Sequence, residues 1–308
     1  MGIPSYFAFL IKNYPQIIQK KILYTIDNLY LDSNSIVYDS VYSLEYNNDN
    51  EFENQIINKV CNTIDSYCTS IKPKKVFITF DGVAPIAKLN QQKSRRYKSW
   101  FTNEMEKKIK SENYNKKLKW NTSAITPGTH FMNKLNTIVY NYFVKNKNTI
   151  HKNIIFEFSG SDKPGEGEHK IFDKIRNEKD YHTNTHTLVY GLDADLIMLC
   201  LHHIHLCKSL NLYRETPHFI KQLDNSLDPD ETYVLNNSLL SEKIISTMSS
   251  KNITNHNDLI HDYIFICFLL GNDFMPHHPA YNIRHSGIHV LLDVYKYLHD
   301  KDKKFILT

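Results

Sequence analysis

Short apolar segments recur along the chain, and acidic residues follow them closely. These segments cover residues 28–31, 76–80, 154–158 and 187–192. Their length of four to six residues and their β-branched and aromatic content predict buried strands. Asp32, Asp81 and Asp193 directly follow three of the segments. The pattern therefore predicts buried strands that deliver carboxylates at their carboxyl ends.

Helical patterns separate the predicted strands. Apolar residues recur every three or four positions over residues 56–67, and again over residues 131–143 after a start signal at Thr126 and Pro127. From about Leu239 onward the whole pattern is helical. Strands that alternate with helices over this length predict an α/β fold, with a mainly parallel central sheet flanked by helices and a helical C-terminal part.

Two parts are expected along the chain, an α/β core over residues 1–240 and a helical extension over residues 241–308. No apolar run reaches the length of about 18 residues that a membrane span requires, and the N-terminus lacks a secretory signal pattern. The five cysteines match no common zinc or redox spacing, so buried thiols in a reducing compartment are expected. We therefore expect an intracellular protein without a membrane partner, and the sequence does not separate cytoplasm from nucleus.

Seven acidic residues form the strongest candidate site. Ligands bind open α/β sheets where the carboxyl ends of the strands emerge. Alternate residues of an extended segment point the same way, so Asp193 and Asp195 can face one site together. Glu166 and Glu168 can reach that site if residues 163–167 form the turn into a helix. The complete candidate set is Asp32, Asp81, Glu166, Glu168, Asp193, Asp195 and Asp273.

The chemistry of this set favours hard cations. Clustered carboxylates repel one another unless cations neutralise them, and an all-oxygen ligand set suits Mg²⁺ or Mn²⁺. Two such ions about 4 Å apart are a common device for cleaving phosphodiesters. Each Asp alone could instead be a helix N-cap, but that reading does not account for the whole set. The histidines at 202, 203, 205, 277 and 278 lack spaced partners and are expected to have packing or surface roles.

A basic segment follows Asp81. Residues 88–120 carry a net charge of +8, against +4 for the whole chain. Pro85 fits the first position of a helix. On that helix one face carries Lys88, Gln92, Arg95 and Arg96. Arginine forks suit phosphate oxygens, so this face predicts a phosphate-binding surface beside the acids rather than a merely solvated helix face.

These residues resemble the Xrn-type 5′→3′ exoribonucleases. The segment DGVAPIAKLNQQKSRR, residues 81–96, is similar to the family's signature after its second catalytic Asp. Other blocks of the family are matched in the same order by MGIP (1–4), LDSN (31–34), ITPGT (125–129), PGEGEH (164–169), YGLDADL (190–196) and GNDFMPH (271–277). Single blocks such as Asp-x-Asp are weak signals, whereas the ordered set is specific.

The resemblance implies a fold like that of the PIN and flap nucleases, with a site of two metal ions built from the seven acids. It also implies a pocket for a 5′-monophosphate formed by the four residues of the basic face. Tyr38 stands where family members have a histidine that stacks on the 5′ nucleotide, and tyrosine can also stack a base. The family's second conserved region would begin near Thr308, so we expect it to be absent from this chain.

The implied activity is metal-dependent hydrolysis of single-stranded RNA from a 5′-monophosphate end to 5′-mononucleotides. One alternative is a flap-type DNA endonuclease, which usually carries a glycine-rich helix–hairpin–helix after its last metal-site Asp. The sequence around Gly271 lacks that glycine pattern. A second alternative is an inactive RNA-binding relative that acts as a scaffold, and the presence of every expected acid argues against it. Protein partners are not indicated.

Overall fold

A computed structural model describes residues 2–22, 24–109, 120–146, 151–215, 227–228, 231–249, 255–272, 274–302 and 304–307. Within these ranges the centre is a seven-stranded sheet in the order β1-β7-β6-β5-β2-β3-β4. The strands are β1 (Ile18–Gln19), β2 (Asn28–Asp32), β3 (Lys75–Thr79), β4 (Ile155–Ser159), β5 (His186–Tyr190), β6 (Ser209–Glu215) and β7 (Thr232–Leu235). Neighbouring strands from β6 to β4 are parallel, whereas β7 is antiparallel to both of its neighbours, β6 and β1. The predicted mainly parallel sheet is confirmed.

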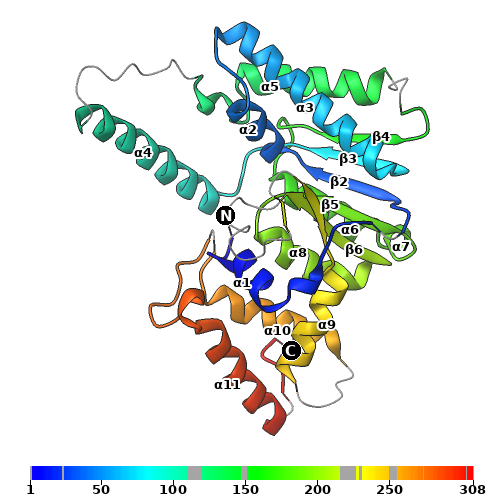
Figure 1. The fold of residues 1–308 in the computed structure, drawn as a ribbon, viewed down its shortest axis with the longest axis vertical. Coiled ribbons are helices and arrows are strands. Elements are labelled where there is room, and N and C mark those ends of the chain that lie inside the picture. Colours follow the sequence, from blue (N-terminus) through cyan, green and yellow to red (C-terminus); the bar gives the residue numbers. More distant parts are fainter. Residues whose placement is uncertain are drawn as a thin grey trace.

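Helices cover both faces of this sheet (Figure 1). They are α1 (Tyr6–Asn13), α2 (Asn34–Tyr42), α3 (Asp49–Ile71), α4 (Ile86–Ile109), α5 (His130–Tyr140), α6 (Gly167–Asn177), α7 (Lys179–His182), α8 (Asp195–His203), α9 (Asn237–Met248), α10 (His256–Phe268) and α11 (Gly287–Asp302). The predicted helical pattern over residues 56–67 lies within α3, and the one over residues 131–143 lies in α5 and the turn that follows it. This π-helical turn (Asn141–Lys145) continues the helix.

Strand alternation divides the interior into two apolar clusters. Leu29 and Leu31 face one way and pack with α2, α3 and α5. Tyr30, between them, faces the other way and packs with α1, α6 and α8. Successive side chains of a strand point to opposite faces, so a central strand buried on both sides must be apolar throughout. This explains the continuous apolar runs in the sequence.

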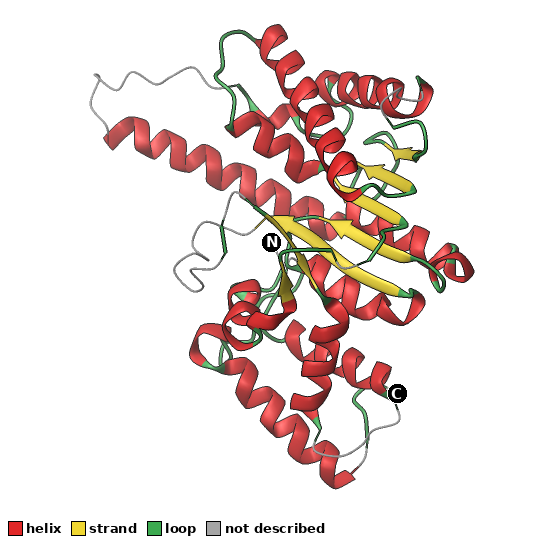
Figure 2. Cartoon of the chain, turned by 45° about the vertical axis from the view of Figure 1, so that its right-hand side comes forward, coloured by secondary structure: helices red, strands yellow, loops and turns green. Residues whose placement is uncertain are grey.

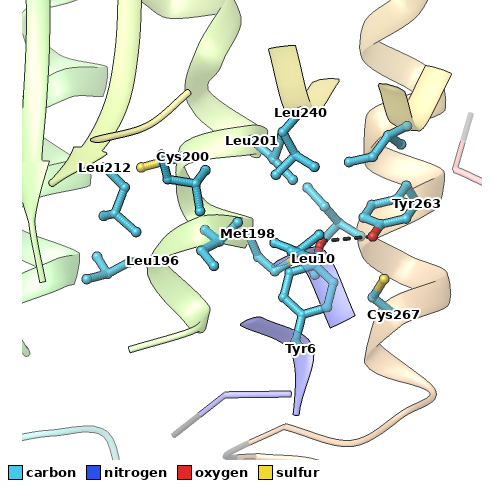
Figure 3. Close-up of a cluster of buried hydrophobic side chains, with 14 of the residues drawn as sticks. Tyr6, Leu10, Leu196, Met198, Cys200, Leu201, Leu212, Leu240, Tyr263 and Cys267 are labelled. Carbon is cyan, nitrogen blue, oxygen red and sulfur yellow. Dashed lines mark hydrogen bonds between the residues drawn. The ribbon is translucent and has the colours of Figure 1, made fainter. Parts of the chain in front are cut away.

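The C-terminal helices α9, α10 and α11 contribute residues to the second of these clusters. Figure 2 shows helices gathered at the lower end of the molecule, near the C-terminus. Leu240 of α9 and Tyr263 of α10 pack with Leu212 of β6 and with α1 (Figure 3). The buried hydroxyls of Tyr6 and Tyr263 lie 2.8 Å apart and form a hydrogen bond that joins α1 to α10. The expected boundary near residue 240 falls inside α9 and stays a prediction. Within the described ranges, no helix is both long enough and apolar enough to cross a membrane.

Helix α4 extends away from the body, with its first turns nearest the sheet (Figure 1). It begins at Ile86, one residue later than predicted. Pro85 lies directly before it, and its carbonyl accepts a hydrogen bond from the Leu89 amide at 3.0 Å. Proline fits this place because its missing N–H would have no partner in the first turn. The helix therefore starts close to the carboxyl ends of the strands.

Candidate active site

The predicted acids gather at one edge of the sheet. Strands β5, β2 and β3 are parallel neighbours, so their carboxyl ends emerge side by side. Asp32 ends β2, and Asp81 and Asp193 follow β3 and β5 within three residues. A cavity of about 470 Å³ opens at this edge. The predicted acids that line it are Asp32, Asp81, Glu166, Glu168 and Asp193, and Asp39 of α2 lines it as well.

Glu166 and Glu168 reach this cavity because α6 begins between them. Glu166 is the N-cap residue and Gly167 the first helical residue, as the predicted turn requires. The Gly167 amide donates to Asp81 Oδ1 at 2.7 Å. A Cβ on Gly167 would lie 2.4 Å from Asp32 Oδ1. Glycine at this position therefore lets the Asp32 carboxylate approach the start of α6.

Two further residues hold the acidic cluster in place. Asn34 donates through its amide to Asp81 Oδ2 at 2.5 Å and accepts from the Asp81 amide at 3.2 Å. Lys170 donates to the carbonyls of Phe80 and Gly160 at 2.7 and 2.8 Å, which ties α6 to the loops after β3 and β4. Sequence reasoning assigned neither residue a role. Asn34 lies in the LDSN block, which was the available signal.

Burial makes the charged forms of these acids costly. It raises the pKa of Asp32 well above its ordinary value, and the negative charges of Asp81 and Glu168 raise it further. Burial, followed by Asp195 and Glu166, raises the pKa of Glu168 to about 8. Burial also raises the pKa of Asp81, although the hydrogen bond from Gly167 opposes this. Bound cations would reverse these shifts, since they favour the ionised carboxylates.

The donor set fits a divalent cation. Asp32 Oδ1 and Glu166 Oε1 are buried atoms with no hydrogen-bond partner among the residues that the structure describes. Buried oxygens without partners are rare in folded proteins, and an ion is one of the few ways to satisfy them. Glu166, Glu168 and His169 each place one ligand atom within 4.8 Å of the others. His169 was missed as a site residue, although it stands in the PGEGEH block.

The four residues of the predicted phosphate-binding face line the same cavity. They are Lys88, Gln92, Arg95 and Arg96. Lys88 is buried, with its Nζ 3.6 Å from Glu166 Oε2 and 5.5 Å from the centre of the Phe274 ring. Arg96 donates to Thr126 Oγ1 at 3.0 Å. The structure thus brings the basic face and the acids together on one cavity.

Tyr38 of α2 also lines this cavity and is 36% exposed. Burial raises its pKa, as do Tyr42 and Asp81, while Arg96 lowers it. The ring therefore lies close enough to both the acidic and the basic residues to sense their charges. An accessible aromatic ring at this place has a face available for a base.

Asp195 departs from its predicted geometry. The expectation of an extended segment through Asp193 and Asp195 is wrong, because α8 begins at Asp195. Asp195 instead lines a neighbouring cavity of about 450 Å³, together with Glu168 and His169. A Cβ on Gly2 would lie 2.2 Å from Asp195 Oδ1, so the N-terminal segment packs directly on this carboxylate. Both aspartates still affect the pKa of Glu168.

The remaining predicted residues either lie outside the described part of the chain or are histidines with packing and surface roles. Asp273 and the lysines at 110, 116, 117 and 119 lie outside the described residues. The packing role expected for His203 is confirmed: it is buried, its Nδ1 contacts the Leu199 carbonyl at 2.8 Å, and Arg176 lies 2.7 Å from its Nε2. His277 and His278 are exposed, as expected of surface histidines.

Comparisons with known proteins were made on both sequence and structure. The model of the XRN 5′-3′ exonuclease N-terminus matches residues 1–216, and that of the Xrn1 helical domain matches residues 253–308. The 5′-3′ exoribonuclease 1 of Saccharomyces cerevisiae is 36% identical over 325 residues, which cover 96% of this chain and 20% of that protein. The human 5′-3′ exoribonuclease 1 is also 36% identical, over 96% of this chain and 18% of its own length.

A relative from Arabidopsis thaliana, 5′-3′ exoribonuclease 2, is 32% identical over 99% of this chain and 38% of its own length. The chain therefore spans well under half the length of these relatives. Among solved structures, the catalytic core of Rad2 in complex with DNA substrate has a TM-score of 0.50 at 12% identity, over 98% of this chain and 71% of that one. This likeness concerns the fold alone and confirms the predicted nuclease-like α/β architecture. Because the N-terminal model alone matches more than half of the chain, this protein belongs to the XRN 5′-3′ exonuclease family.

Proposed function

We propose that this protein is a 5′→3′ exoribonuclease that hydrolyses single-stranded RNA from a 5′-monophosphate end and releases 5′-mononucleotides. The observation that carries the proposal is one cavity lined both by five of the predicted acids and by the basic face of α4. The names of the relatives, 5′-3′ exoribonucleases 1 and 2, support it. The chain spans only part of their length, so its activity requires a direct test.

The acids would hold two divalent cations, Mg²⁺ or Mn²⁺. The proposed ligands are Asp32, Asp81, Glu166, Glu168, Asp193 and Asp195, with Asp273 added from the family resemblance. Such ions, when bound, stabilise the charge that develops on a phosphate under attack and lower the pKa of water. The protein's own contribution is to fix the carboxylates beforehand, through Asn34 and the Gly167 amide on Asp81.

The basic face would hold the terminal phosphate of the RNA. Arg95 and Arg96 offer planar forks for its oxygens, and Lys88 offers a compact charge next to Glu166. Tyr38 would stack on the base of the first nucleotide. We expect this face to accept a single terminal phosphate and to refuse a cap or a triphosphate.

Bond changes follow from this arrangement. Water adds to the phosphorus between the first two nucleotides, and the bond from that phosphorus to the 3′-oxygen of the first nucleotide breaks. The 3′-oxygen leaves with a proton, so the first nucleotide departs as a 5′-mononucleotide. The phosphorus stays on the second nucleotide and becomes its 5′-phosphate. The same basic face can then bind this new terminus, and the reaction can repeat in the 5′→3′ direction.

The test compares RNAs of one sequence that carry a 5′-monophosphate or a 5′-hydroxyl, in Mg²⁺. We expect rapid hydrolysis of the first RNA only, and equal rates would remove the phosphate pocket from the proposal. Lys88→Ala should lower kcat/KM for the phosphorylated RNA by about 10- to 100-fold, since a charged hydrogen bond is worth about 1.5–3 kcal/mol. Lys93→Ala is the matched control on the same helix, because Lys93 is exposed and does not line the cavity.

A third substrate separates RNA from DNA. Single-stranded DNA with the same sequence and a 5′-phosphate should be degraded much more slowly than the RNA. Faster degradation of the DNA would contradict the proposed substrate and favour a DNA nuclease. No hydrolysis of any substrate, with cations bound, would favour a binding protein instead.

A further inference from the structure

One donor in the acidic cluster is a nitrogen. Glu166 is the N-cap residue of α6, and His169 lies three residues later in the first turn of that helix. His169 Nδ1 lies 3.8 Å from Glu166 Oε2. Together with Glu168, these residues bring one oxygen or nitrogen each within 4.8 Å of one another, which is close enough to share a cation after small side-chain rotations.

Burial of Glu166 points independently to a ligand at this place. The residue is 5% exposed, and its Oε1 has no hydrogen-bond partner among the described residues. Its other oxygen is 3.6 Å from Lys88 Nζ. A carboxylate held in this way has one oxygen that remains to be satisfied, on the residue that lies beside the imidazole.

The cluster therefore has two chemically different ends. Around Asp32 and Asp81 the neighbours are other carboxylates, an amide side chain, a backbone amide and the ammonium groups of Lys88 and Lys170. At the other end Glu168 and His169 form part of the wall of the neighbouring cavity. The imidazole is 40% exposed there, so it can turn toward an ion without disturbing the core. A neutral imidazole also adds a ligand without adding negative charge.

We propose that His169 binds one of the two cations through Nδ1, together with Glu166 and Glu168, and makes that position selective for Mn²⁺ over Mg²⁺. Mg²⁺ requires oxygen ligands in near-ideal octahedral geometry. Mn²⁺ also binds carboxylates well, but as a transition metal it accepts an imidazole nitrogen more readily than Mg²⁺ does. The other position, at Asp32 and Asp81, has only oxygen ligands and accepts Mg²⁺. The inference rests on the proposed function only in assuming that cations bind in this cavity.

Pulsed electron paramagnetic resonance of the Mn²⁺-loaded protein tests this directly, because a ligating nitrogen modulates the electron spin echo and a carboxylate does not. We expect nitrogen modulation in the wild-type protein and its loss in His169→Ala. His202→Ala is the matched control, since His202 lines the same neighbouring cavity from α8 and should leave the signal unchanged. No modulation in the wild type, or its survival in His169→Ala, would overturn the proposal.

Calorimetric titration gives a second readout. His169→Ala should weaken Mn²⁺ binding by at least about tenfold and leave Mg²⁺ binding unchanged. Equal losses for both ions would show that His169 only supports the fold of the cluster, and thermal denaturation of both variants checks that they fold. Failure here is distinguishable from failure of the proposed function. If the protein hydrolyses phosphorylated RNA in Mg²⁺ but shows no nitrogen modulation, only the role of His169 is refuted. If it shows nitrogen modulation but does not hydrolyse the RNA, only the proposed nuclease activity is refuted.

Discussion

Gly167 gives the sharpest test of how the carboxylates are positioned. It is the first residue of α6, where alanine would normally be favoured by up to about 1 kcal/mol. In Gly167→Ala, however, the new Cβ would meet Asp32 Oδ1 at 2.4 Å and Thr79 Oγ1 at 2.9 Å. Ordinary contact begins at 3.4 Å, so the Asp32 carboxylate must move by about 1 Å.

A displacement of this size should affect activity far more than stability. Overpacking costs about 1–3 kcal/mol, which the helical preference of alanine partly offsets, so the net loss should be about 0–2 kcal/mol. A misplacement of about 1 Å at a reacting centre can lower the rate by about 100-fold. We therefore expect Gly167→Ala to fold and to bind RNA, but to hydrolyse it about 100-fold more slowly.

The assay is single-turnover hydrolysis of a 5′-phosphorylated RNA at saturating protein, with thermal denaturation alongside it. Asn177→Ala is the matched control, because Asn177 is an exposed residue at the end of the same helix and far in sequence from the acids. The Asn177→Ala variant should be slightly more stable than wild type and should hydrolyse the RNA at the wild-type rate. A rate for Gly167→Ala within about threefold of wild type would refute the reasoning, since Asp32 would then not need its observed position.

Three other predictions concern the same cavity. Asn34→Ala removes both hydrogen bonds to Asp81 and should cost about 1–3 kcal/mol of stability and slow hydrolysis, and an unchanged single-turnover rate would contradict this. Asp193→Ala should abolish hydrolysis while the protein still folds, because Asp193 is an exposed residue; retained turnover would exclude it from the site. Burial raises the pKa of Glu168 from 4.5 to about 8, so the unfolded chain binds fewer protons between these values. In EDTA, stability should therefore fall as pH rises from 4.5 to about 8, more steeply than in Glu168→Gln, and equal slopes in thermal denaturation would contradict it.

The edge of the sheet was predictable because its signal is local. A buried strand reads as an apolar run, and the acid after it must emerge at the carboxyl end, so Asp32 and Asp81 could be placed from sequence. The turn at Gly167 was predictable for a similar reason, since only a helix start lets Glu166 and Glu168 act at one site. These features depend on residues that are neighbours in the chain.

Contacts between distant segments could not be predicted in this way. Asn34 and Asp81 are 47 residues apart, and nothing in either segment alone indicates that an amide side chain holds the carboxylate. The course of the chain after β5 was mistaken, because α8 already begins at Asp195, where this carboxylate meets the distant N-terminal segment at Gly2. His169 was missed because its role depends on the helical geometry that follows Glu166. Each of these depends on tertiary structure.

The relation between α4 and α6 bears most directly on exonucleolytic cleavage. In such an enzyme, the residues that bind the terminal phosphate must lie at a fixed distance from the acids that act on the next phosphate. Here the loop before α4 and the loop before α6 are joined by two backbone hydrogen bonds, from the Gly82 amide to the Gly165 carbonyl at 2.8 Å and from the Gly165 amide to the Val83 carbonyl at 3.0 Å. A Cβ on Gly82 would lie 1.7 Å from the Lys163 carbonyl, so glycine is required for this approach.

The spacing between the basic face and the glutamates is thus set mainly by the backbone. Backbone pairs of this kind move less than long side chains do, and beside this junction Lys88 Nζ lies 3.6 Å from Glu166 Oε2. In the proposed function this fixed spacing would measure one nucleotide at each cycle.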